Sequence, residues 1–184
     1  MKIFRYLDHS EQMGFGRFDE QGQTFSIEKL ANGDFQATDR KISPSRFLTP
    51  IDFRCIYGVG LNYRAHAEET GMEIPKNPMV FMKAPTASQN PGDPIVIPRF
   101  LRSDKVDYEG ELGVVIGRPC KNVSPADALS HVLGYTCAND VSARDWQKEK
   151  GGGQFFRGKT FDTFCPVGPC LTTADEITDP SKLT

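Results

Sequence analysis

The chain has 184 residues, of which 38% are hydrophobic and 25% are charged, and this balance is typical of a globular protein with one substantial core. A formal net charge of −2 and a pI near 5.9 give no basic excess, so we expect no nucleic-acid partner and no membrane partner. The five cysteines form no CxxC pair, which argues against a disulfide framework and a zinc site. We therefore expect a cytoplasmic protein that acts on a small molecule.

Short strands are predicted in the first fifty residues. Apolar or aromatic residues alternate there with polar ones, between turns of Gly, Asp and Gln, at residues 2–7, 15–18 and 24–27. A segment rich in Ser and Pro, residues 42–50, follows them. We expect residues 1–50 to form a small N-terminal β module and residues 51–184 to form a second domain.

The remainder of the chain combines strands with few, short helices. A helix is predicted from Tyr63 to Thr70, with Asn62 as its N-cap and Gly71 as its C-terminal stop. Another is predicted from Ser124 to Gly134, because Ser-Pro-Ala-Asp is typical of a helix start. This second helix would join two strands into a strand–helix–strand unit. Strands are predicted at residues 55–59, 79–83, 108–116 and 135–139.

Two glutamates occur two positions apart on the strand predicted at 108–116. Because strand side chains alternate between faces, Glu109 and Glu111 project from the same face. Their like charges are costly side by side unless they face water or a cation lies between them. A third carboxylate, Asp140, follows the returning strand, and three carboxylates suit Mg²⁺ or Mn²⁺, with Ca²⁺ also compatible. An exposed acidic strand face is the alternative.

A histidine and a glutamate lie three positions apart on the first predicted helix. His66 and Glu69 therefore share one helix face, where they could form a hydrogen bond or hold a common water. A histidine steered by a carboxylate is a usable general base near neutral pH. The alternative is an exposed polar pair without a role.

Cationic and amide side chains near the end of the chain are candidates for substrate contacts. Lys159 has a flanking glycine and nearby aromatics, which favour a partly buried ammonium that could neutralise a developing enolate. Arg144 and Gln147, three positions apart, could bind a substrate carboxylate through several donors. A surface lysine and a solvated polar helix are the alternative interpretations.

Four motifs follow one another in a recognisable order: YGVGLNY at 57–63 with His66, DYEGEL at 107–112, NDVSARD at 139–145 and GKTF at 158–161. Together they resemble the fumarylacetoacetate hydrolase family, over roughly residues 50–184. The resemblance implies an α+β, mostly β fold. This fold is a mixed β roll with few short helices, preceded by the small N-terminal β module that varies among bacterial members.

The resemblance also implies a metal site and a substrate class. Mg²⁺ or Mn²⁺ would be held by Glu109, Glu111 and Asp140 and would act as a Lewis acid on a small oxo-acid, whose keto and carboxylate oxygens chelate it. The family likeness further implies a homodimer.

Catalytic roles follow from the same resemblance. His66, oriented by Glu69, would activate a water in hydrolytic members, and Lys159 with Gln147 would stabilise the departing enolate.

Three functions are compatible with these roles. The first is a divalent-metal-dependent hydrolase or lyase that cleaves a C–C bond in an acylpyruvate or related β-keto acid. The second is an isomerase or decarboxylase of an unsaturated oxo-dicarboxylic acid from the degradation of aromatic compounds. Similar family members continue beyond the equivalent of residue 184 with further strands, so we expect a C-terminally truncated member. The third possible function is therefore that of an inactive fragment that serves in binding or assembly.

Overall fold

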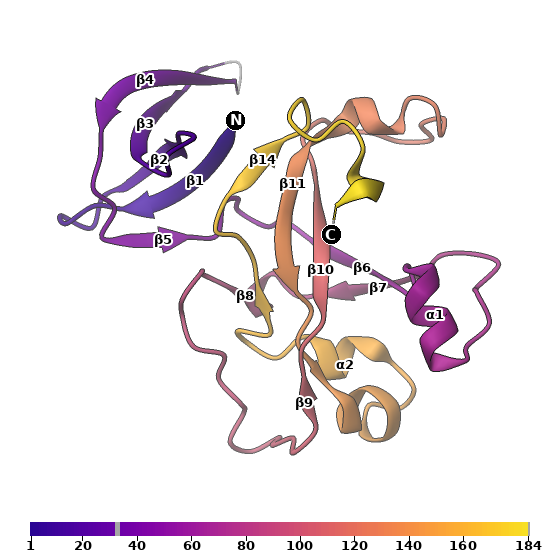
Figure 1. The fold of residues 1–184 in the computed structure, drawn as a ribbon. Helices are drawn as coiled ribbons and strands as arrows, with labels where there is room; N and C mark the ends of the chain where they lie inside the picture. The colour runs from indigo at the N-terminus through magenta and orange to yellow at the C-terminus, as the bar shows by residue number, and fades with distance from the viewer. Residues whose placement is uncertain (32–33, 184) are drawn as a thin grey trace.

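The N-terminal part of the computed structural model, which describes residues 1–31 and 34–183, consists of short antiparallel strands (Figure 1). Most of these strands lie where apolar and polar side chains alternate along the sequence. The strands are β1 (Lys2–Leu7), β2 (Met13–Phe18), β3 (Thr24–Lys29), β4 (Phe35–Lys41) and β5 (Arg46–Leu48).

Residues 51–183 add nine further strands to those of the N-terminal part. They are β6 (Ile56–Gly60), β7 (Met79–Lys83), β8 (Ser88–Gln89), β9 (Val106–Asp107), β10 (Gly110–Ile116), β11 (Val132–Asn139), β12 (Ser142–Ala143), β13 (Cys165–Pro166) and β14 (Leu171–Thr173). Two α-helices accompany them, α1 (Arg64–Thr70) and α2 (Phe155–Lys159). Single helical turns complete the set: the 3₁₀ turns Pro85–Ala87, Ala128–His131 and Pro180–Lys182, and the π-helical turn Trp146–Lys150. The predicted α+β, mostly β class is confirmed.

One eight-stranded sheet joins the two parts of the chain. Its order is β10-β11-β14-β1-β2-β3-β4, with β5 also paired to β1. The join is the antiparallel pairing of β1 with β14, in which Lys2 lies opposite Thr172. Smaller ladders, β6-β7, β12-β9 and the parallel β13-β8, lie outside this sheet. The division at residue 50 stays a prediction, and β1 and β14 show that main-chain hydrogen bonds cross it.

An aromatic cluster fills the core of the N-terminal strands. Phe4 is 0% exposed, and its ring centroid lies 4.5 Å from that of Phe18 and 5.1 Å from that of Phe47. Because strand side chains alternate, Phe4 and Tyr6 turn to the same side of β1, and their rings contact each other edge to face. These rings supply the apolar burial that holds the small strands together.

The helix predicted from Ser124 to Gly134 is wrong. The structure has a 3₁₀ turn at Ala128–His131, and β11 begins at Val132. The cap interaction does form, because Ser124 Oγ donates to Asp127 Oδ2 at 2.7 Å, but this local hydrogen bond stabilises a turn as well as a helix start. Since β10 and β11 are antiparallel neighbours, a turn is enough to connect them.

Other elements of the structure also differ from those predicted from the sequence. Helix α1 ends at Gly71 as predicted, in the left-handed conformation with φ of 66°, but its N-cap is Tyr63 and not Asn62. Strands β4 and β5 were not predicted, because β4 is mostly polar and β5 has three residues, too few to show an alternation. They form where β3 and β1 offer unpaired edges.

Within residues 1–31 and 34–183, no helix has the length and hydropathy needed to cross a bilayer.

Two phenylalanines at opposite extremes of burial test the importance of the N-terminal cluster. Phe4→Ala should lower the free energy of unfolding by about 3–5 kcal/mol, because it removes a fully buried ring. Phe100, which is 99% exposed, is the matched control, and its replacement by Ala should change stability by less than about 0.5 kcal/mol. Urea denaturation of both variants measures the difference. Equal effects would contradict the proposed core.

Candidate active site

Two of the predicted metal ligands lie opposite each other at the adjoining ends of β10 and β11. Glu109 directly precedes β10 and Asp140 directly follows β11. The Asp140 amide donates to the Glu109 carbonyl at 2.9 Å, and the Glu109 amide donates to Asn139 Oδ1 at 3.1 Å. Backbone pairing therefore fixes the distance between these two acidic residues.

The ammonium of Lys159 lies between the two carboxylates. It is 2.7 Å from Glu109 Oε2, 2.6 Å from Asp140 Oδ2 and 2.7 Å from Ser142 Oγ. The side chain is buried, in agreement with the prediction from its flanking glycine and aromatics. Burial by itself opposes ionisation of Glu109, but hydrogen bonds and positive charge from Lys159 and Arg144 hold its pKa below the usual value.

A second buried lysine was missed by the sequence analysis. Lys83, the last residue of β7, is 2% exposed and donates to Asp140 Oδ1 at 2.6 Å and to the Val141 carbonyl at 3.2 Å. Burial lowers its pKa, although the negative charge of Asp140 opposes that shift. The available signal was its position: Lys83 shares the inward face of β7 with Met79 and Phe81, where a charged residue needs a partner.

The third predicted ligand, Glu111, lies on β10 and faces the same carboxylates. Burial raises its pKa, and the negative charges of Glu109 and Asp140 raise it further, against a hydrogen bond from Tyr63 that lowers it. The Tyr63 hydroxyl also accepts a hydrogen bond from the Leu112 amide at 3.2 Å. Tyr63 was not predicted as a site residue, and it joins the start of α1 to β10.

The three acidic side chains have the chemistry that a hard divalent cation requires. Across residues 1–31 and 34–183, no three Asp, Glu, His or Cys side chains are already gathered to hold an ion. The charges of Glu109, Glu111 and Asp140 nevertheless act on one another, and a cationic nitrogen already bridges the first and the third. As a donor set, three carboxylates have the chemistry that fits Mg²⁺ or Mn²⁺.

Arg144 and Gln147 both face this cluster. Arg144 donates to Asp107 Oδ2 through Nε at 3.1 Å and Nη2 at 2.8 Å. Its Nη1 donates to Glu109 Oε1 at 2.5 Å and to Gln147 Oε1 at 3.1 Å. The fork of donors expected for a substrate carboxylate thus binds the protein's own carboxylates, and the substrate-binding role of both residues stays a prediction.

His66 and Glu69 do not form a direct hydrogen bond. The distance from His66 Nδ1 to Glu69 Oε2 is 3.9 Å, and both side chains are largely exposed. His66 lies in the first turn of α1, which follows Tyr63 directly, and the Tyr63 side chain forms a hydrogen bond with Glu111. The catalytic role of this pair stays a prediction.

A buried carboxylate supports the turn that carries Gln147. Asp145 accepts hydrogen bonds from Ser103 Oγ, from the Trp146 amide at 3.0 Å and from Lys150 Nζ at 2.8 Å. Burial alone would raise the pKa of Asp145, but these hydrogen bonds lower it to about 2.

Helix α2 approaches this turn closely at Gly158. A Cβ there would lie 2.5 Å from the Gln147 amide nitrogen and 2.8 Å from the Ala143 carbonyl. The glycine before Lys159 therefore allows the backbone approach that places the ammonium among the carboxylates.

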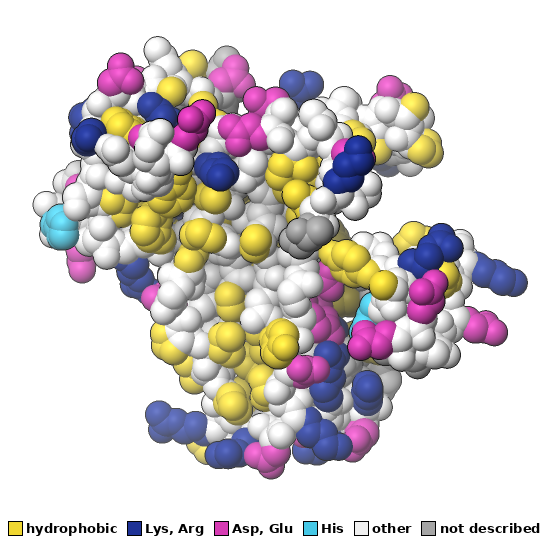
Figure 2. Space-filling model, viewed as in Figure 1, with side chains coloured by type: hydrophobic (Ala, Val, Ile, Leu, Met, Phe, Trp, Pro, Cys, Tyr) yellow, Lys and Arg dark blue, Asp and Glu magenta, His cyan; other side chains and the backbone are white. Residues whose placement is uncertain are grey.

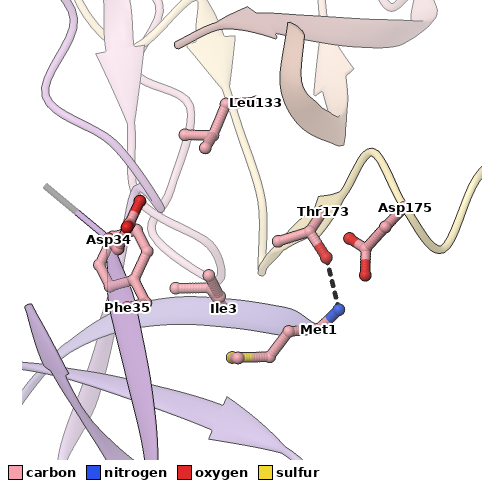
Figure 3. A pocket seen from close by; sticks show the side chains of 7 residues that line it. All are labelled: Met1, Ile3, Asp34, Phe35, Leu133, Thr173 and Asp175. Carbon is pink, nitrogen blue, oxygen red and sulfur yellow. Dashed lines mark hydrogen bonds between the residues drawn. The ribbon is translucent and has the colours of Figure 1, made fainter.

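The surface of the molecule shows a cluster of charged side chains and, apart from it, a hollow near the N-terminus. Figure 2 shows acidic, Lys and Arg side chains gathered beside the lobe that carries α1. A separate hollow of about 400 Å³ lies where the N-terminal strands meet β14, and Figure 3 shows Met1 donating a hydrogen bond to Thr173 there. None of the predicted site residues lines this hollow, which is bordered by Met1, Ile3, Asp34, Phe35, Leu133, Thr173 and Asp175.

Comparison with known proteins identifies the family. The sequence profile described as Fumarylacetoacetate (FAA) hydrolase C-terminal matches residues 55–184. The chain belongs to the fumarylacetoacetate hydrolase family. The mitochondrial oxaloacetate tautomerase fahd2 of Xenopus laevis is 51% identical over 125 residues, which are 68% of this chain and 39% of that protein.

Solved structures of family members share the fold. A 5-carboxymethyl-2-hydroxymuconate delta-isomerase from Mycobacterium smegmatis has a TM-score of 0.77 and 40% identity, over 94% of this chain and 66% of its own. A fumarylacetoacetate hydrolase from psychrophilic Exiguobacterium antarcticum has a TM-score of 0.80 and 34% identity, over 98% and 69%. The names of these family members describe a hydrolase, an isomerase and a tautomerase. The chain spans less than half the length of curated relatives such as the tautomerase.

The buried Asp145 predicts a specific dependence of stability on pH. Because its folded-state pKa, about 2, is lower than its ordinary value of 3.8, its ionised form stabilises the fold above pH 3.8, and this contribution disappears as the pH falls toward 2. Asp145→Asn should therefore be less stable than the parent at pH 6, with a smaller difference at pH 3. Denaturant unfolding at both pH values measures this. A difference that does not shrink in acid would contradict the assignment.

Proposed function

We propose that this chain carries the metal and substrate site of an enzyme that converts a small oxo-acid through its enolate. The observation that carries the proposal is the bridge from Lys159 to Glu109 and Asp140. It combines oxygen donors for a cation with a buried positive charge beside them. The membership of the chain in a family that includes hydrolases, isomerases and tautomerases supports it.

The proposed metal is Mg²⁺ or Mn²⁺, held by Glu109, Glu111 and Asp140. When bound, it would supply Lewis-acid polarisation of the keto and carboxylate oxygens of the substrate. The chain's own contribution is to orient these ligands: the β10-β11 pairing fixes Glu109 and Asp140, and Tyr63 holds Glu111.

The remaining residues stabilise negative charge. Lys159, kept in a buried position by α2, is available to stabilise the oxygen on which negative charge develops as the enolate forms. We assign Arg144 and Gln147, which are hydrogen-bonded to each other, to binding of the substrate carboxylate. The small oxo-acid partner and the homodimer remain proposals that rest on the family likeness.

Proton transfer is the reaction that this geometry favours. Tautomerisation or isomerisation of an oxo-acid moves a proton between carbon atoms or between carbon and oxygen and consumes no water. The buried ammonium of Lys159, beside Glu109 and Asp140, can stabilise an enolate oxygen in a reaction that needs no activated water. The 51% identity to a protein named oxaloacetate tautomerase favours the same reaction.

Hydrolytic or lyase cleavage of a C–C bond, as in an acylpyruvate, is the second candidate. It is favoured by the position of His66 in the first turn of α1, close in the chain to Tyr63, which forms a hydrogen bond with Glu111. In this reaction His66 would remove a proton from water, and the resulting hydroxide would attack the carbonyl carbon. The C–C bond would then break with its electron pair forming the enolate.

Metal binding tests the proposal directly. Asp140→Asn should weaken Mn²⁺ binding by about tenfold or more, because it removes a charged ligand. Asp104→Asn removes an exposed carboxylate that forms an ion pair with Arg102, and it should leave Mn²⁺ binding unchanged. Titration calorimetry measures both. Equal Mn²⁺ affinity in the two variants would contradict the proposed site.

Removal of the metal is a second test. A chelator should abolish any turnover of oxaloacetate or acylpyruvates. Tight Mn²⁺ binding without turnover would favour the binding or assembly fragment instead.

Two substitutions separate the candidate reactions. For proton transfer, His66→Ala should leave the rate of oxaloacetate tautomerisation within about threefold of the parent, whereas Lys159→Ala should reduce kcat by about a hundredfold or more. For hydrolysis, His66→Ala should reduce acylpyruvate cleavage by about a hundredfold or more. Rates of both reactions, followed by ultraviolet absorbance of the enol, decide between them.

A further inference from the structure

The ammonium of Lys159 occupies the point at which two proposed metal ligands converge. Its nitrogen lies 2.7 Å from Glu109 Oε2 and 2.6 Å from Asp140 Oδ2. The Lys159 side chain is 2% exposed, and the side chains of Glu109 and Asp140 are 25% and 11% exposed. In this arrangement Lys159 supplies the positive charge that the carboxylates need.

A divalent cation cannot share this point with the ammonium. Carboxylate oxygens bind Mg²⁺ or Mn²⁺ at about 2.0–2.5 Å, so a metal on the same two oxygens would lie almost where the nitrogen lies. Two positive centres in contact within a buried site repel each other strongly. One of them has to leave.

We propose that Lys159 is a tethered cation that holds the metal-free site together and is displaced when the metal binds. This inference rests on the metal site proposed above. Ser142 Oγ, 2.7 Å from the same nitrogen, is a neutral acceptor that can keep the ammonium inside the site after it has released the two carboxylates. The displaced ammonium is then free to face a substrate.

Lys83 provides a matched comparison. It is also 2% exposed and also lies 2.6 Å from an oxygen of Asp140. Its partners, however, are Asp140 Oδ1 and the Val141 carbonyl, on the other side of the carboxylate from the bridge to Glu109. Loss of either lysine removes the same charge from the same carboxylate, but only Lys159 stands where the metal would bind.

Mn²⁺ titration of the 184-residue chain and its variants tests the inference. Lys159→Met should bind Mn²⁺ about tenfold or more tightly than the parent, because the competing ammonium is gone. Lys83→Met removes an equal charge from Asp140 but leaves the ammonium of Lys159 in place, so it should tighten Mn²⁺ binding by less than Lys159→Met does. Equal effects of the two substitutions, or weaker binding by Lys159→Met, would overturn the inference. If the parent binds Mn²⁺ and Asp140→Asn does not, the proposed metal site stands even when this inference fails.

Stability measurements guard against a folding artefact. Without metal, Lys159→Met should have a lower Tm than the parent, because it leaves two carboxylates facing each other, and added Mn²⁺ should raise its Tm by more than it raises that of the parent. Lys159→Gln, a neutral side chain that can still donate to both carboxylates, is the second variant and should show the same order. If Mn²⁺ stabilises the parent more than either variant, Lys159 assists the metal and is not displaced by it.

Discussion

Burial of like charges beside one another is the constraint on which this structure depends. Glu109 and Asp140 lie at adjoining strand ends, and they can remain ionised there only because three cationic side chains bind them: Lys83, Lys159 and Arg144. A buried charge that loses its partner is strongly destabilising. Since the five residues come from β7, β10, β11, α2 and the turn after β12, the charge balance also fixes these elements relative to one another.

Close packing of the backbone brings these charged side chains within reach of one another. The absence of a side chain at Gly158 lets α2 approach the turn after β12, and Asp145 satisfies the amide and the lysine of that turn. Apolar packing of Val141 and Phe164 closes the same region from the other side. Steric fit and electrostatics thus act on the same few residues.

The parts that could be predicted from the sequence are those set by local periodicity. Alternation along a strand placed Glu111 beside Glu109, and the end of the next strand placed Asp140. The partner of Lys83 could not be found in this way, because Asp140 is 57 positions away along the chain; strand alternation indicates only that Lys83 faces inward.

The errors in the fold have the same origin. The helix expected after Ser124 fails because a capping hydrogen bond does not distinguish a turn from a helix. Strand β4 is mostly polar and becomes a strand only through its pairing with β3. The four ordered motifs indicated the protein family and hence a class of function, which periodicity alone does not indicate.

The pairing of β1 with β14 has a consequence for the behaviour of the chain in solution. Strand β14 lies between β11 and β1, so in the absence of β1 its outer row of amides and carbonyls would be an open edge. Open edges recruit strands from other molecules and lead to aggregation. The N-terminal strands therefore protect the sheet that carries the acidic site from self-association, although they contribute no residue to the site itself.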